Sequence, residues 1–254
     1  MPSLMRIVPA GILAAVIILS TAACGSARSG ASGVSPTPAA SPLAGLTANQ
    51  IIQKALNDLT TASSVRVVGK GANSGENFAF DLTDVAAHGC QGTMTMTRTA
   101  ASPGDAGTGA FDLIEADGTG YVKISQGYLK SVGAPASALA ELNGKYLKVT
   151  SASVIAEFGP FCDLSDLAKD IAKKIPGFAK AGTATVDGRP VLAFKRPNNA
   201  ADGTVYISDS DTPEIVSFSG PAREGSYDFT NYNARATITA PPSGDVVVDS
   251  NLAG

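Results

Sequence analysis

The chain has 254 residues, of which 44% are hydrophobic and only 16% are charged, and it contains 27 glycines and no tryptophan. Its formal net charge is -3, and its lysines and arginines are scattered, which excludes the basic surface that a nucleic-acid partner requires. This composition suits a β-rich extracytoplasmic protein better than a cytosolic helical enzyme.

The N-terminal end reads as an export signal. Arg6 precedes an uncharged apolar stretch over residues 7–19, and small residues then lead to Cys24. A basic start, an apolar core too short to span a bilayer comfortably and a small-residue cleavage site are typical of a secretory signal peptide. The segment before the cysteine resembles the lipobox of bacterial lipoproteins, although Thr21 stands where that motif usually has leucine. We therefore expect residues 1–23 to be removed.

The lipobox resemblance implies that the Cys24 thiol is acylated. The protein is then expected on the outer face of the cell membrane, held there by its N-terminal lipid. Plain secretion and an uncleaved anchor are the alternatives. Residues 24–45 are rich in glycine, serine and proline without an apolar period, and we predict a disordered tether. Residues 46–250 are predicted to form the folded domain.

Two further cysteines need an assignment. If Cys24 is acylated, Cys90 and Cys162 form an even pair in an oxidising compartment, for which a disulfide is the default interpretation. A zinc site is the second possibility, because His88 and Asp163 lie beside these cysteines. Neither side has a paired Cys-x-x-Cys spacing, and free thiols are the third possibility.

The ordered part of the chain begins with a helix. Thr47 and Gln50 have the spacing of a capping box, and apolar residues follow at helical spacing until residues 62–64. These apolar residues are Ile51, Ile52, Ala55, Leu56 and Leu59.

From Val65 onward the apolar period changes to two, which predicts antiparallel strands with one apolar face each. Turns are expected at residues 73–75 and 117–118, and residues 103–109 form a polar, glycine-rich connection. The alternating apolar positions are Val65, Val67, Phe78, Phe80, Leu82, Met94, Met96, Phe111, Leu113, Val122 and Ile124.

The middle of the chain turns helical and then returns to strands. The pattern predicts a short helix at 135–142, a strand at 145–149, a helical turn at 151–158 and a clear helix at 163–175. Three strand pairs follow, at 183–186 with 191–195, at 204–207 with 214–218, and at 226–232 with 234–239. Residues 240–242 end the sheet and 245–249 trail off. The fold class is thus α+β, a long antiparallel sheet with helices on one side.

The order of these elements resembles the actinobacterial lipoproteins of the LppX/LprG/LprA/LprF-like family, whose fold is shared with the LolA and LolB carriers. The matching residues are Ala22-Ala23-Cys24, Ala55-Leu56, Ala62-Ser63-Ser64-Val65-Arg66-Val67, Val186-Asp187-Gly188-Arg189-Pro190, Val205-Tyr206-Ile207 before Pro213, and Ile238-Thr239-Ala240-Pro241-Pro242. The resemblance implies a curved antiparallel sheet, an incomplete barrel, with helices packed on its concave side and acylated lipid held between sheet and helices.

Catalytic motifs are missing from the sequence: it has no Gly-x-Ser-x-Gly, Ser-x-x-Lys, P-loop or His-Glu-x-x-His pattern. A hydrolase would have to use His88, the single histidine, and we rank this hypothesis last. We expect no enzyme, no cofactor and no metal.

The favoured hypothesis is a carrier for an acyl lipid or glycolipid, attached to the membrane by its lipid anchor, with an envelope transporter or enzyme as a further candidate partner. The alternative is a tethered scaffold or binding module for another cell-envelope protein. The same apolar side chains would then fill a dry core. The predicted cavity residues are Val65, Val67, Phe78, Phe80, Leu82, Met94, Met96, Val122, Ile124 and Leu147.

Overall fold

The computed structural model describes residues 41–73, 76–98, 107–149, 162–220 and 225–248, all within one unit, Ala40–Gly254. The predicted helical turn at 151–158 and Cys24 lie outside the described residues. Among those residues, no helix is long and apolar enough to cross a membrane.

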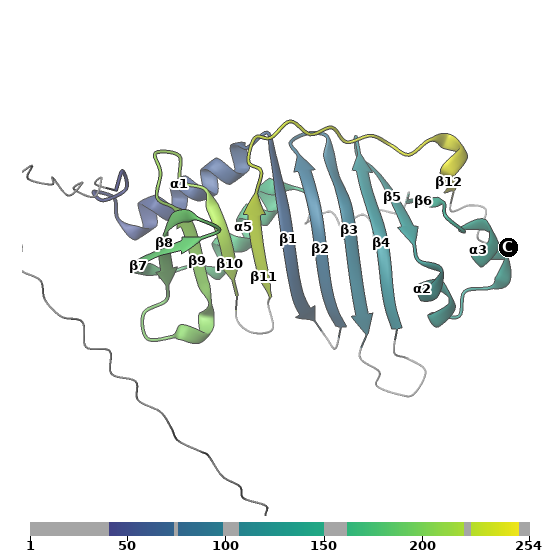
Figure 1. Ribbon diagram of the computed structural model, residues 1–254, viewed down its shortest axis with the longest axis horizontal. Coiled ribbons are helices and arrows are strands. Elements are labelled where there is room, and N and C mark those ends of the chain that lie inside the picture. Colours follow the sequence, from purple (N-terminus) through teal and green to yellow (C-terminus); the bar gives the residue numbers. More distant parts are fainter. Residues whose placement is uncertain (1–40, 74–75, 99–106, 150–161, 221–224, 249–254) are drawn as a thin grey trace, which may run out of the picture. The chain divides into compact units, whose positions relative to one another are not determined.

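The described strands form one open sheet (Figure 1). In chain order, its first six strands are β1 Ser64–Asn73, β2 Glu76–Val85, β3 Gly89–Arg98, β4 Gly107–Ala116, β5 Thr119–Ile124 and β6 Tyr146–Val149. The six that follow are β7 Ala179–Val186, β8 Arg189–Lys195, β9 Thr204–Ser208, β10 Ile215–Ser219, β11 Ser226–Thr230 and β12 Val246–Val248.

The order of the twelve strands across the sheet is β12-β6-β5-β4-β3-β2-β1-β11-β10-β9-β8-β7. Neighbours are antiparallel except β12 and β6, which run parallel. The chain thus lays β1 to β6 side by side in sequence and later returns to add β11 on the free side of β1. The predicted α+β class, with a curved sheet that does not close, is confirmed.

Four described α-helices accompany the sheet: α1 Ala48–Thr61, α2 Gln126–Ser131, α3 Ala136–Glu141 and α5 Leu164–Lys174. The predicted capping box of α1 is confirmed, because the backbone N–H of Gln50 donates to Thr47 Oγ1 at 3.3 Å and that of Thr47 donates to Gln50 Oε1 at 2.8 Å. The N-terminus of α5 is capped by Asp163, whose Oδ1 accepts from the backbone N–H of Ser165 at 2.7 Å.

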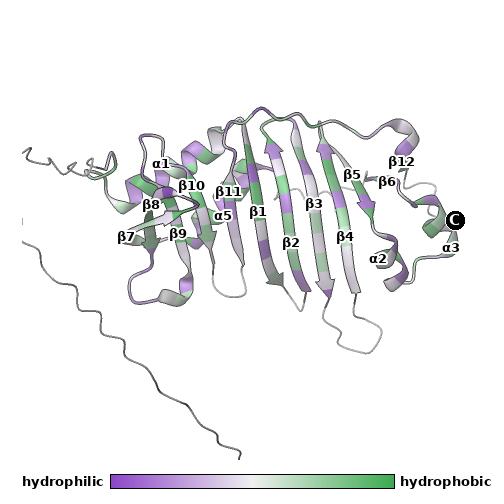
Figure 2. Ribbon diagram, in the orientation of Figure 1, coloured by the Kyte–Doolittle hydropathy of each residue, from purple (hydrophilic) through white to green (hydrophobic). Residues whose placement is uncertain are grey.

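The hydrophobic core joins the buried faces of α1 and α5 to one face of the sheet. Phe194 of β8, Phe218 of β10 and Phe229 of β11 are fully buried. Figure 2 shows hydrophobic and hydrophilic residues alternating along the long strands, as expected for a sheet with one covered face.

The predicted strand at 234–239 is wrong. These residues are not in a strand, because β11 already pairs with β1 on one side and β10 on the other, which leaves no edge for a returning strand. The expectation that 245–249 trails off was also wrong at Val246–Val248, which pairs with β6. Helix α2 was not predicted, and β4 begins at Gly107, inside the expected glycine-rich connection.

The described structure begins before the predicted start of the domain. Leu43, which composition assigned to the tether, is only 2% exposed. The Lys180 ammonium donates to the backbone carbonyl of Leu46 at 2.8 Å, and the Ser41 hydroxyl donates to Asp209. Residues 41–45 are therefore packed against β7 and the segment that follows β9.

Candidate functional site: an apolar sheet face that ends in carboxylates

Strand register places the predicted cavity residues on one face of the sheet. Residues paired directly across two strands share a face, as do alternate residues along one strand. Leu82 pairs with Val67, Phe80 with Met94 and Phe78 with Met96. On the other side of β4, Val122 pairs with both Leu113 and Leu147. All ten predicted residues therefore face the same side, together with Phe111 and Leu113 of β4.

Burial confirms that this face is an interior surface. All of the predicted residues except Leu147 belong to, or pack against, the main hydrophobic cluster, with Phe78, Met96 and Ile124 only partly buried. Leu147 packs against a smaller cluster formed by Leu129, Leu142 and Val247. Sequence reasoning missed Tyr227 and Phe229 of β11, which continue the same face, although their alternation with polar residues was a usable signal.

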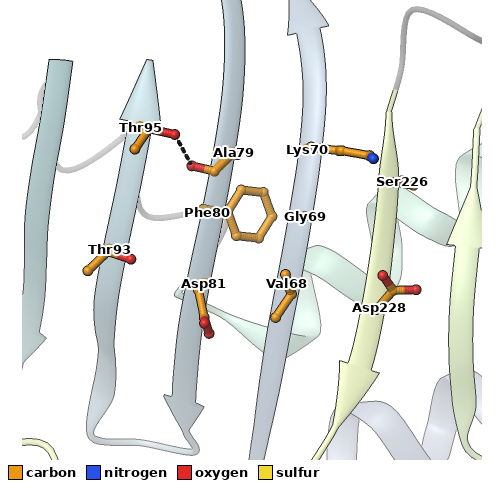
Figure 3. Close-up of a pocket in the computed structure, with 10 residues that line it drawn as sticks. All are labelled: Val68, Gly69, Lys70, Ala79, Phe80, Asp81, Thr93, Thr95, Ser226 and Asp228. Carbon is orange, nitrogen blue, oxygen red and sulfur yellow. Dashed lines mark hydrogen bonds between the residues drawn. The ribbon is translucent and has the colours of Figure 1, made fainter. Parts of the chain in front are cut away.

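Glycines let two aromatic rings lie flat against this face. A Cβ at Gly69 would be 2.3 Å from Phe80 Cζ, and a Cβ at Gly71 would be 2.6 Å from Phe78 Cζ. Figure 3 shows the Phe80 ring beside Gly69 on the neighbouring strand. The two rings are nearly parallel, with centroids 6.4 Å apart and an interplanar angle of 11°. The result is a low, continuous aromatic surface over β1 and β2.

Helices α1 and α2 contact different parts of the sheet. Helix α1 contacts α5 and the strands β7 and β10, near one edge of the strand order, where Figure 1 also draws α1 and α5. Helix α2 contacts β4, and its Tyr128 ring meets Phe111 edge-on with centroids 5.0 Å apart. The flat aromatic surface of β1 and β2 lies between these two contact regions in the strand order.

The apolar face ends in carboxyl groups. Asp84 pairs with Cys90, and Cys90 pairs with Glu115, so these three side chains continue the same face past Leu82 and Leu113. Asp84 is 2% exposed and its Oδ2 has no hydrogen-bond partner. Burial raises the pKa of Asp84 to about 7, and the charges of Asp163 and Glu115 add to the shift. Burial, followed by the charge of Asp163, also raises the pKa of Glu115.

A disulfide between Cys90 and Cys162 ties this end of β3 to the start of α5, with 5.0 Å between the two Cα atoms. The zinc alternative needs both cysteines as thiolates, and the disulfide removes them. His88 is exposed, and its Nδ1 lies 3.6 Å from Oδ1 of Asp117. Within the described ranges, no group of three His, Cys, Asp or Glu side chains is arranged to hold a metal ion.

The opposite face of β1 to β4 is polar. Arg66 Nε donates to Asp81 Oδ1 at 2.7 Å, and this hydrogen bond lowers the pKa of Asp81. A shallow pocket on this face, shown in Figure 3, is lined by Val68, Gly69, Lys70, Ala79, Phe80, Asp81, Thr93, Thr95, Ser226 and Asp228. Of the predicted cavity residues, only Phe80 lines it, so this pocket is not the predicted cavity.

No family model matches the chain, and no curated protein matches it. Among solved structures, the chain is similar to the crystal structure of LprF from Mycobacterium bovis, with 17% sequence identity, a TM-score of 0.49, and coverage of 76% of this chain and 95% of that one.

Proposed function

We propose that this protein is an extracytoplasmic lipoprotein, anchored in the membrane through Cys24, that binds or carries an acylated lipid along the apolar face of β1 to β6. The single observation that carries the proposal is the flat placement of the Phe78 and Phe80 rings over Gly71 and Gly69. Rings that lie flat take up less height above the sheet than upright rings would, and Phe78 is partly exposed, whereas Phe80 is covered by other side chains.

The neighbouring side chains suit the same ligand. Met94 and Met96 lie next to the rings on β3, and an unbranched, polarizable methionine adapts to the varied shapes of acyl chains. Each buried methylene of a ligand contributes about 0.8 kcal/mol, so contact with even part of a chain holds a lipid firmly. The predicted helices over the concave side would cover the bound chain.

Extraction of bound lipid tests the proposal. The full-length protein is purified from membranes in detergent and its non-covalent acyl chains are extracted into organic solvent and quantified by mass spectrometry. An aliquot that is unfolded by heat and repurified gives the background, and acyl groups on Cys24 stay with the protein. We expect bound lipid well above that background.

A matched pair of variants locates the lipid. Met96→Lys places an ammonium on the apolar face, while Thr95→Lys places the same group on the polar face of the same strand. We expect Met96→Lys to lose most of the extractable lipid and Thr95→Lys to retain it. Wild-type protein without lipid above background would refute the proposal, and equal retention by both variants would refute this location.

A further inference from the structure

The apolar face has a polar end at one fixed place. Along β2 the side chains on this face run Phe78, Phe80, Leu82 and then Asp84. Along β4 they run Phe111, Leu113 and then Glu115. Because β3 pairs with both strands in register through Cys90, the two carboxyl groups end the face at the same level. An amphiphilic ligand with its chain along the strands would place its head there.

Among the described residues, no hydrogen-bond donor reaches the buried carboxylate oxygen at this polar end. Asp84 Oδ2 is buried without a partner, and a buried acceptor in that state costs free energy that a donor would recover. Each influence on the pKa of Asp84 raises it: burial, the charge of Asp163 and the charge of Glu115. Asp163 already accepts two backbone N–H groups of α5, and Cys90 is in a disulfide. The described neighbours therefore supply acceptors and no donor.

We propose that Asp84 and Glu115 form a head-group subsite that accepts hydrogen bonds from a hydroxyl-bearing, uncharged lipid head and rejects an anionic one. This inference rests on the proposed lipid-binding function. A hydroxyl supplies the missing donor to the buried Oδ2. A phosphate head would place negative charge beside three carboxyl groups in a poorly solvated site, where like charges repel strongly.

The subsite is expected to respond to pH. The groups that face Asp84 are Glu115 from β4 and Asp163 from the start of α5, while Val65 of β1 and Cys90 of β3 contribute no charge. An ionised carboxylate accepts a stronger hydrogen bond than a protonated one. With a pKa of about 7 for Asp84, the preference for a hydroxyl head therefore increases as the pH rises through neutrality.

Three lipids with identical acyl chains test the inference: dioleoylglycerol, its acetate ester and dioleoyl phosphatidic acid. The full-length protein in detergent micelles is equilibrated with an equimolar mixture, separated by gel filtration and extracted for mass spectrometry. We expect dioleoylglycerol to be retained about tenfold over the other two lipids near pH 8 and with a smaller preference near pH 6, because a hydrogen bond to a charged group is the stronger one.

The variants separate this subsite from the rest of the face. Asp84→Val removes the carboxylate and should abolish the preference for dioleoylglycerol over its acetate ester. Asp81→Asn is the matched control on the polar face of the same strand and should keep the preference. If Asp84→Val does not fold, the comparison of lipid retention by wild-type protein near pH 6 and near pH 8 decides. A preference for dioleoylglycerol that does not rise with pH overturns the inference.

The remaining outcomes are equally decisive. Equal retention of all three lipids by wild-type protein overturns the subsite and leaves the lipid-binding proposal intact. Preferential retention of phosphatidic acid also overturns it. Retention of none of the lipids overturns the proposed function, and the subsite with it.

Discussion

Gly69 of β1 lies beneath the ring of Phe80 on β2, so close that a Cβ at this glycine would be 2.3 Å from Cζ of the ring. The two residues are direct cross-strand partners, and the Phe80 side chain is only 4% exposed. Because the ring is held among other buried side chains, it has little room to move away. The glycine is thus required by packing, without any unusual backbone conformation.

We predict that Gly69→Ala lowers the free energy of unfolding by about 1–3 kcal/mol, the usual cost of overpacking a core. Gly127→Ala is the control, because a Cβ at Gly127 meets nothing within 4 Å and the residue lies in helix α2. There alanine should be neutral or stabilising by up to about 1 kcal/mol. Denaturant unfolding measures both. Equal stability of Gly69→Ala and wild type would show that the ring moves freely.

The buried carboxyl group of Asp84 makes stability depend on pH. Its pKa is about 7 in the folded protein, against 3.8 for an ordinary aspartate, so the folded state binds this proton more tightly. Its stabilising contribution is fully present below about pH 3.8 and is lost as the pH rises through about 7. The difference in pKa corresponds to roughly 4 kcal/mol.

We therefore predict that the free energy of unfolding of wild type falls between about pH 4 and pH 7 and that Asp84→Asn flattens this fall. Asp81→Asn is the control, because the hydrogen bond from Arg66 lowers the pKa of Asp81. The titration of Asp81 therefore changes the free energy of unfolding only at acidic pH. Urea unfolding at several pH values across this range gives the slope of the free energy of unfolding against pH for wild type and for each variant. A slope in Asp84→Asn as steep as in wild type would assign the pH dependence to other groups.

Local patterns in the sequence predicted the strands and their apolar face, because these features are determined by residues that are close together in the sequence. The capping box of α1 and the Asp187-Gly188 turn between β7 and β8, where both residues have positive φ, are further examples. The failures concern the sheet edges. The chain at 234–239 looks like a strand but has no free edge beside β11, whereas Val246–Val248 finds one beside β6.

The candidate site was predicted in part for the same reason. Alternation identified the ten apolar residues, but not that they are continuous with Asp84 and Glu115, which read as ordinary polar strand residues. Only the register of β2, β3 and β4 brings the two carboxyl groups beside Cys90, and only tertiary packing brings Asp163 near them. The role of Gly69 likewise depends on its partner across the strand.

The N-terminal anchor gives a prediction that depends on the sequence alone. If the Cys24 thiol is acylated, Cys24→Ala abolishes lipoprotein processing, and the mature acylated form disappears from the membrane fraction. Thr21→Leu restores the usual lipobox residue and should speed processing. Pulse-chase labelling with membrane fractionation follows both. Unchanged processing and partition of Cys24→Ala, with or without globomycin, would refute the lipid anchor.

The disulfide provides the final prediction, because it connects stability to the carboxylate end of the face. Cys90 and Cys162 are 72 residues apart, and the chain-entropy model gives about 4 kcal/mol for closing a loop of this length. We expect the double variant Cys90→Ala/Cys162→Ala to lose stability on this scale. A thiol reductant should lower the stability of wild type similarly and leave the double variant unchanged.

The same double variant should also alter the titration of Asp84. The disulfide holds Cys162, and with it the adjacent Asp163, against β3 beside Asp84. Without it the start of α5 is free to move away, which removes the charge of Asp163 and admits water, and both effects lower the pKa of Asp84. We therefore expect a shallower loss of stability between about pH 4 and pH 7 than in wild type. An unchanged slope would show that α5 stays docked without the disulfide.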